Sequence, residues 1–202
     1  MLENTHNGKA LGLDYIAQAA EFAGRHGLSL HLDGARVFNA ATELGVEVKE
    51  IVRHVDSVSI CFSKGLGAPV GSLLCGSGPF IAAAKRWRKM AGGGLRQAGV
   101  LAAAIDYALD HHVERLRSDH AHAKRLAQAV SKIDAITLIS SQTNMVFIEL
   151  PDEGIGVQLG QFLAERGVSV LGGKRMRLVT HLDISAADTE TVIALFREYF
   201  AS

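Results

Sequence analysis

Two side chains with complementary chemistry, Asp33 and Lys64, each follow a short apolar run that has the pattern of a strand. A lysine amine can form a Schiff base with a carbonyl compound, and a carboxylate can pair with a protonated pyridine nitrogen. Pyridoxal 5′-phosphate (PLP) needs one group of each kind, one for each end of its ring. The two residues alone leave a second interpretation open, in which Asp33 caps a loop and Lys64 is a solvated surface lysine.

The elements around these residues predict how they are placed. Strands are expected at 28–32 and 57–62, with a helix at 44–55 between them. Strand, helix and strand at this spacing form a βαβ crossover, so the two strands should be parallel neighbours. Asp33 and Lys64 would then rise from the carboxyl edge of one sheet, where open α/β sheets bind ligands.

A third strand is predicted at 70–75, and seven residues, 63–69, connect it to the second. A parallel crossover needs a dozen or more residues, so the third strand should be antiparallel and could lie at the sheet edge. Gly65, Gly67 and Gly71 would let the backbone of this region approach a ligand closely. Their spacing is not that of the G-x-G-x-x-G dinucleotide loop, and the sequence contains no P-loop.

The rest of the chain predicts two domains, 1–105 and 106–202, joined by a long helical stretch. The second should be a small α+β domain, because its strands do not alternate regularly with helices. The further helices are expected at 11–26, 78–90, 97–133 with a break near His111, 155–166 and 186–200, and the further strands at 136–140, 144–150, 168–171 and 177–181.

Composition narrows the class of protein. The 202 residues carry 21 Lys and Arg against 21 Asp and Glu, which disfavours a nucleic-acid binder coated in positive charge. Two cysteines, Cys61 and Cys75, exclude a disulfide scaffold, and both are expected to be inert core thiols because they lie in predicted strands.

No apolar run is long enough for a membrane span, so we expect a soluble, cytoplasmic protein. No metal site is expected, since no i,i+4 pair occurs among the histidines of the helical region, His111, His112, His120 and His122.

Five segments, in order along the chain, resemble the low-specificity L-threonine aldolases, which are PLP enzymes of the aminotransferase-like fold (fold type I) grouped with the β-eliminating lyases. Together they span residues 2–183. The segments are Leu2-Glu-Asn-Thr-His-Asn-Gly8, His31-Leu-Asp-Gly-Ala-Arg36, Ser63-Lys-Gly-Leu-Gly-Ala-Pro-Val-Gly-Ser72, Arg86-Trp-Arg-Lys-Met-Ala-Gly-Gly-Gly-Leu-Arg-Gln97 and Arg177-Leu-Val-Thr-His-Leu-Asp183. The resemblance implies an α/β fold comprising part of a PLP-binding large domain and a small C-terminal α+β domain.

The resemblance also assigns roles to residues around the cofactor. Lys64 would be the Schiff-base lysine, Asp33 the partner of the pyridine nitrogen, and Ser63 a neighbour of the cofactor phosphate. Arg36 and Arg177 would hold the α-carboxylate of an amino-acid substrate, a task suited to the planar guanidinium.

Two further positively charged residues imply that the protein is an oligomer. In the family, a lysine and an arginine near a triple glycine reach the cofactor phosphate of a neighbouring subunit, and Lys89 and Arg96 match them here. The resemblance therefore implies a homo-oligomer, a dimer or tetramer. The implied reaction cleaves L-threonine or L-allo-threonine to glycine and an aldehyde such as acetaldehyde, as in threonine catabolism and glycine biosynthesis. None of these residues identifies the base that takes the hydroxyl proton.

The sequence departs from the family at its start. Family members carry a long stretch before the Glu-Asn-Thr-His-Asn segment, with a Gly-Thr phosphate loop and a histidine that stacks on the cofactor. We therefore expect a fragment or truncated reading frame that binds PLP weakly or not at all by itself. Two alternatives stay open: another fold type I PLP lyase, such as a β-eliminating lyase or a decarboxylating synthase, and a non-catalytic remnant that only associates with partner chains.

Overall fold

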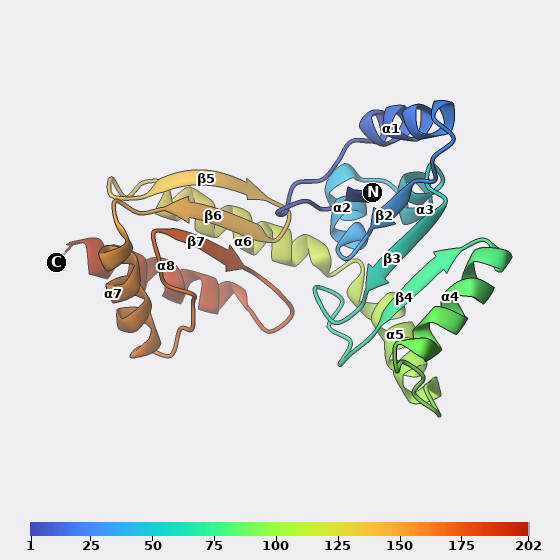
Figure 1. The fold of residues 1–202 in the computed structure, drawn as a ribbon. Coiled ribbons are helices and arrows are strands. Elements are labelled where there is room, and N and C mark those ends of the chain that lie inside the picture. Colours follow the sequence, from blue (N-terminus) through green and yellow to red (C-terminus); the bar gives the residue numbers. More distant parts are fainter. Residues whose placement is uncertain (202) are drawn as a thin grey trace. The chain divides into compact units, whose positions relative to one another are not determined.

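The structure is a computed structural model that describes residues 1–201, and it divides into two compact units, Met1–Leu116 and the residues from Arg117 onward. The first unit builds a mixed sheet and the second an antiparallel sheet, each with its own helices (Figure 1). Within residues 1–201, no helix has the length and apolar character to cross a membrane.

The sheet of the first unit has the order β1-β2-β3-β4. Strands β1 (Leu2–Glu3), β2 (His31–Asp33) and β3 (Ser57–Cys61) are parallel, and β4 (Ser72–Gly76) pairs antiparallel with β3 at the edge. The predictions of a parallel pair and of an antiparallel edge strand are thereby confirmed. Strand β1 was not predicted, because two residues are too few to show an alternating pattern.

Five helices belong to the first unit: α1 (Leu13–Arg25), α2 (Val37–Leu44), α3 (Val48–Val52), α4 (Gly78–Met90) and α5 (Gly99–His112). Helices α1, α2 and α3 bury their apolar residues against β2 and β3, with Ile16, Leu32 and Ile51 fully buried. The expectation of one helix at 44–55 is wrong. Gly45 adopts a left-handed conformation, with φ of 67°, which ends α2 and separates it from α3.

The second unit starts within α6 (Leu116–Val130), so the long helical stretch is interrupted after His112, close to the expected break. Strands β5 (Thr137–Gln142), β6 (Met145–Glu149) and β7 (Arg175–Val179) form an antiparallel sheet, and α7 (Glu153–Ala164) and α8 (Ala186–Ala201) complete the unit. Its core contains Ile148, Leu163 and Phe196, all buried.

The expected strand at 168–171 is wrong, since these residues form no ladder in the structure. The chain that follows packs its backbone against α7: a Cβ on Gly156 would lie 2.1 Å from the carbonyl oxygen of Gly173. The expectation of two core cysteines is also wrong in part. Cys61 is half-buried, but Cys75 is exposed because it lies on the edge strand β4, whose residues are all exposed.

Candidate active site

Asp33 and Lys64 lie at the same edge of the sheet. Asp33 is the last residue of β2 and Lys64 comes three residues after the end of β3, and these strands are parallel neighbours with Asp33 opposite Ser59. The Gly34 amide donates to the Ser59 carbonyl oxygen at 2.8 Å, which ties the loop after β2 to β3. The carboxyl edge of two parallel strands thus carries a carboxylate and an amine, as the crossover predicts.

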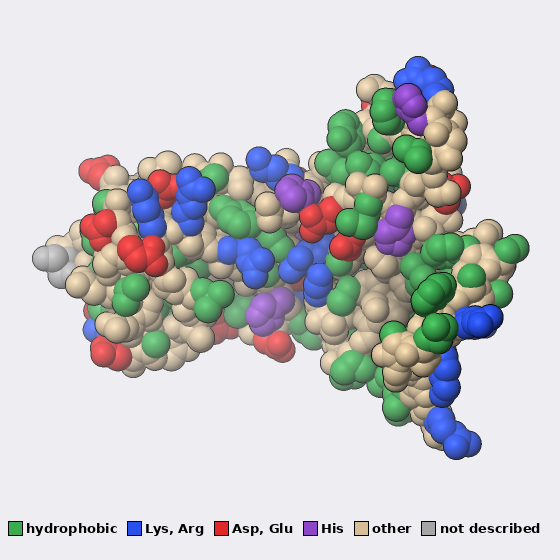
Figure 2. All heavy atoms as spheres, in the orientation of Figure 1, with side chains coloured by type: hydrophobic (Ala, Val, Ile, Leu, Met, Phe, Trp, Pro, Cys, Tyr) green, Lys and Arg blue, Asp and Glu red, His purple; other side chains and the backbone are tan. Residues whose placement is uncertain are grey.

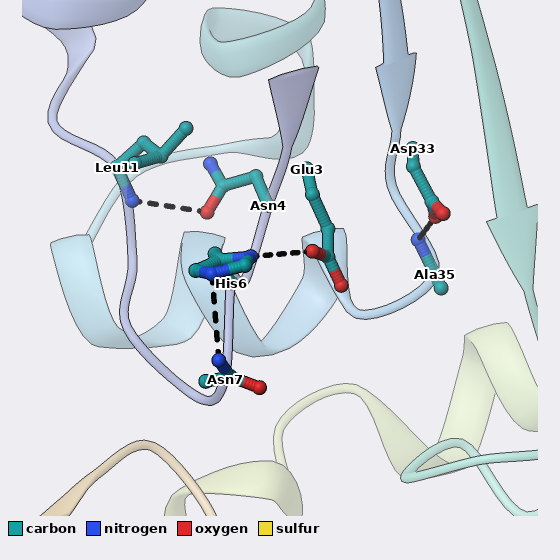
Figure 3. Close-up of polar contacts among 7 residues, drawn as sticks. All are labelled: Glu3, Asn4, His6, Asn7, Leu11, Asp33 and Ala35. Carbon is teal, nitrogen blue, oxygen red and sulfur yellow. Dashed lines mark hydrogen bonds and ion pairs between the residues drawn. The ribbon is translucent and has the colours of Figure 1, made fainter. Parts of the chain in front are cut away.

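The loop after β2 fixes the carboxylate. One oxygen of the half-buried Asp33, Oδ1, accepts a hydrogen bond from the Ala35 amide at 3.0 Å (Figure 3). Glycine is required next, because a Cβ on Gly34 would lie 2.8 Å from Val58 Cγ2 and 3.0 Å from a backbone oxygen. Arg36 follows at the N-cap of α2 and is half-buried.

The loop after β3 presents Lys64 on a tight turn. The Gly67 amide donates to the Lys64 carbonyl oxygen, and the Ala68 amide donates to that of Phe62, both at 2.9 Å. The Lys64 side chain is exposed, whereas Gly65 directly after it is buried. Ser63 is exposed, with its Oγ 3.2 Å from Cys61 Sγ.

The loop after β1 adds a residue that the site analysis of the sequence missed. Asn4 is fully buried, and its backbone amide donates to the Asp33 carbonyl oxygen at 2.8 Å. Its side-chain oxygen, Oδ1, accepts from the Leu11 backbone amide at 3.0 Å (Figure 3). The other side-chain atom, Nδ2, is buried with no hydrogen-bond partner among residues 1–201. A buried donor left unpaired is costly, so Asn4 offers a hydrogen bond to a ligand. Its place in the Glu-Asn-Thr-His-Asn segment was the available signal.

The same loop holds a close contact between two exposed side chains, His6 and Glu3. His6 Nδ1 lies 2.5 Å from Glu3 Oε2, and the Asn7 side-chain nitrogen lies 3.4 Å from the other ring nitrogen of His6 (Figure 3). Glu3 is opposite Asp33 in the parallel register, so a histidine and two carboxylates share this part of the edge.

Lys89 and Arg96 flank the glycine turn after α4, and both are exposed. Gly93 leaves little space for a side chain, since a Cβ there would lie 2.8 Å from Arg88 Cγ and 3.0 Å from the Arg88 carbonyl oxygen. Lys and Arg side chains line the part of the surface where α4 and this turn lie (Figure 2).

Arg177 is an exposed residue of β7 in the second unit, opposite Phe147 of β6. The structure thus carries Asp33, Arg36, Ser63 and Lys64 on neighbouring loops of one unit, and Arg177 on the other. No cluster of three or more potential metal ligands (His, Cys, Asp or Glu) occurs in residues 1–201.

The fold is that of the fold type I enzymes. A threonine aldolase of Leishmania major matches 98% of this chain and 61% of its own, with a TM-score of 0.77 at 18% identity. A serine palmitoyltransferase of Sphingomonas wittichii matches 98% of this chain and 53% of its own, with a TM-score of 0.74 at 20% identity.

Residues 1–153 match the beta-eliminating lyase family, and the chain belongs to it. The low specificity L-threonine aldolase of Escherichia coli (strain K12) is 46% identical over 200 residues, which cover 99% of this chain and 60% of the relative. Low-specificity L-threonine aldolase 1 of Arabidopsis thaliana is 42% identical over 206 residues, covering 98% and 58%. The chain thus spans about 60% of the length of these relatives.

Proposed function

We propose that this chain carries the cofactor-binding lysine of a PLP-dependent aldolase that cleaves L-threonine and L-allo-threonine to glycine and acetaldehyde. The observation that carries the proposal is the shared carboxyl edge of β2 and β3, which bears Asp33 and Lys64. The two relatives at 42% and 46% identity, both low-specificity L-threonine aldolases, support this substrate class over other reactions of the family.

The residues of this edge suit PLP. Lys64 offers an exposed amine, Asp33 a carboxylate held by its own loop, and Asn4 a buried donor with no partner among residues 1–201. When bound, PLP would supply an aldehyde for the lysine and an electron sink for the negative charge that bond cleavage leaves on the substrate Cα.

Each polar residue of the site would then have its own role toward the cofactor or the substrate. Asp33 would keep a proton on the ring nitrogen, because a nearby negative charge favours the protonated form. Lys64 would bind the cofactor covalently and give way to the amine of the substrate. Ser63 would donate to the phosphate from the same loop. Arg36 and Arg177 would bind the substrate carboxylate, each through paired N–H donors.

The same proposal includes an assembly and a location. Lys89 and Arg96 would reach the phosphate in a neighbouring subunit of a homo-oligomer, a dimer or tetramer; both are exposed beside the glycine turn. A cytoplasmic location suits the two free cysteines, since reducing compartments keep thiols unpaired.

A chimera tests the activity with the remainder of a complete enzyme supplied. This chain would replace the matching 60% of the Escherichia coli relative, and release of glycine and acetaldehyde from L-threonine would be measured. We expect cleavage that Lys64→Ala abolishes and that Lys85→Ala, a change on exposed α4, leaves unchanged. 2-Oxobutanoate and ammonia formed from L-threonine, instead of glycine and acetaldehyde, would point to a β-eliminating lyase and refute the proposal.

A further inference from the structure

We propose that His112 is a positioning residue for Lys64, and that it acts by holding the loop at 62–71 through a hydrogen bond to its backbone. This inference rests on the proposed role of Lys64. His112 lies in the last turn of α5, 46 residues from its partner in the sequence, and it is half-buried.

The contact is short and its direction is fixed by chemistry. His112 Nδ1 lies 2.6 Å from the carbonyl oxygen of Leu66. A carbonyl oxygen can only accept, so Nδ1 carries the proton and donates. Leu66 is two residues after Lys64 and is 3% exposed, which places the accepting carbonyl on the turn that presents the lysine.

Helix α5 packs against this loop. Ile105 and Ala108 pack with Phe62, Leu66 and Ala68 in one buried cluster. Together with His112 they occupy positions i, i+3 and i+7, which share one helix face. Apolar contacts of this kind tolerate sliding, whereas a hydrogen bond fixes direction, so His112 sets the register of the loop on the helix.

Loss of the hydrogen bond between His112 and Leu66 should make the turn that carries Lys64 more mobile. The Leu66 carbonyl would be left without the donor that now satisfies it, in a buried setting where unpaired polar groups are costly. The loop would then sample conformations that turn Leu66 toward water, and the Lys64 amine would move with them.

Three variants separate this role from a general contribution to helix stability. His112→Leu removes the donor and keeps the bulk. His112→Asn places an amide nitrogen at the same number of bonds from Cα as Nδ1, so it can restore the bond. His111→Leu is the matched control: His111 is the exposed neighbour, and its ring lies 4.3 Å from that of Tyr107, against 5.6 Å for His112.

Amide hydrogen exchange on the chain without cofactor is the first measurement. We expect exchange at 62–71 to be at least about tenfold faster in His112→Leu than in the wild type, and close to wild type in His112→Asn and His111→Leu. Exchange in α1 and in β5–β6 serves as an internal reference and should not change. Unchanged exchange at 62–71, equal acceleration throughout the first unit, or failure of His112→Asn to restore protection would each overturn the proposal.

Lysine labelling is the second measurement. The chimera described above would be incubated with PLP and reduced with borohydride, and the modified lysines located by peptide mass spectrometry. We expect His112→Leu to lower the yield at Lys64 severalfold relative to Lys85, and His112→Asn to restore it; an unchanged ratio would overturn the link to Lys64. If the chimera with His112 intact is not labelled at Lys64, the proposed function fails, while the exchange result still decides whether His112 anchors the loop.

Discussion

Replacing Gly65 with alanine tests how tightly the Lys64 loop is packed. The φ angle of Gly65 lies outside the left-handed region, so its backbone conformation is open to alanine. What opposes a side chain at position 65 is the lack of space around it. A Cβ would lie 3.0 Å from Leu116 Cδ2 and 3.2 Å from Asn39 Oδ1, and both neighbours are buried.

The magnitude follows from these distances. Nonbonded carbons are optimal at roughly 3.5–4.0 Å, so the loop or its neighbours must move by a few tenths of an ångström. Overpacking of this kind costs about 1–3 kcal/mol, and we expect Gly65→Ala to lower the free energy of unfolding by that amount. Part of the strain should be relieved by a shift of the turn, which would also reduce labelling of Lys64 by PLP.

Denaturant unfolding with a matched glycine gives the assay. Gly24 lies within α1, and a Cβ there would meet nothing within 4 Å. Gly24→Ala should therefore stabilise the first unit, by up to about 1 kcal/mol from helix propensity. We expect the two substitutions to change the free energy of unfolding in opposite directions. Equal or higher stability of Gly65→Ala would refute the claim that packing against Leu116 and Asn39 fixes this loop.

Three further predictions concern the second unit and the substrate. Gly156→Ala should destabilise the second unit by about 3 kcal/mol or more, because its Cβ would lie 2.1 Å from the Gly173 oxygen; a thermal unfolding curve unchanged from wild type would contradict this. At the start of α8, the Ser185 hydroxyl and amide donate to the Asp188 carboxylate and hold its pKa below the ordinary 3.8. The ionised form is the one stabilised, so the stability advantage of wild type over Ser185→Ala should be largest above pH 3.8 and shrink as the pH falls through the lowered pKa, down to what the Ser185 hydroxyl contributes by accepting from the Asp188 amide at 3.1 Å; an advantage independent of pH between 2 and 6 would exclude this cause. In the chimera, Arg36→Lys should raise KM for L-threonine about tenfold, since a lysine cannot pair bidentately with a carboxylate, and an unchanged KM would remove Arg36 from the carboxylate site.

The sequence predicted the part of the site that depends on strand order. The apolar runs before Asp33 and Lys64 and the helical spacing between them required parallel neighbours, and β2 and β3 pair in this way. The short connection after Lys64 likewise predicted the antiparallel β4. These inferences succeed because the length of a connection limits the direction of the strand that follows.

Other features could not be predicted because they depend on contacts between distant segments. Asn4 was quoted only as part of a motif; its burial follows from the pairing of β1 with β2, and β1 is two residues long. The anchoring of Leu66 by His112 joins residues 46 apart, and no local pattern marks either of them. The helix boundary at Gly45 was missed for a different reason: the apolar periodicity at 44–55 continues across this glycine, whose left-handed conformation ends α2.

The central claim is that Lys64 is the lysine that binds the cofactor, and trapping tests it most directly. The chimera with the Escherichia coli relative would be treated with PLP, reduced with borohydride and digested, and the modified lysines of this chain located by mass spectrometry. We expect Lys64 to be labelled in clear preference to the exposed lysines Lys9, Lys85 and Lys89, and Lys64→Ala to lose that preference. Equal labelling of all four lysines, or a pattern that Lys64→Ala leaves unchanged, would contradict the account.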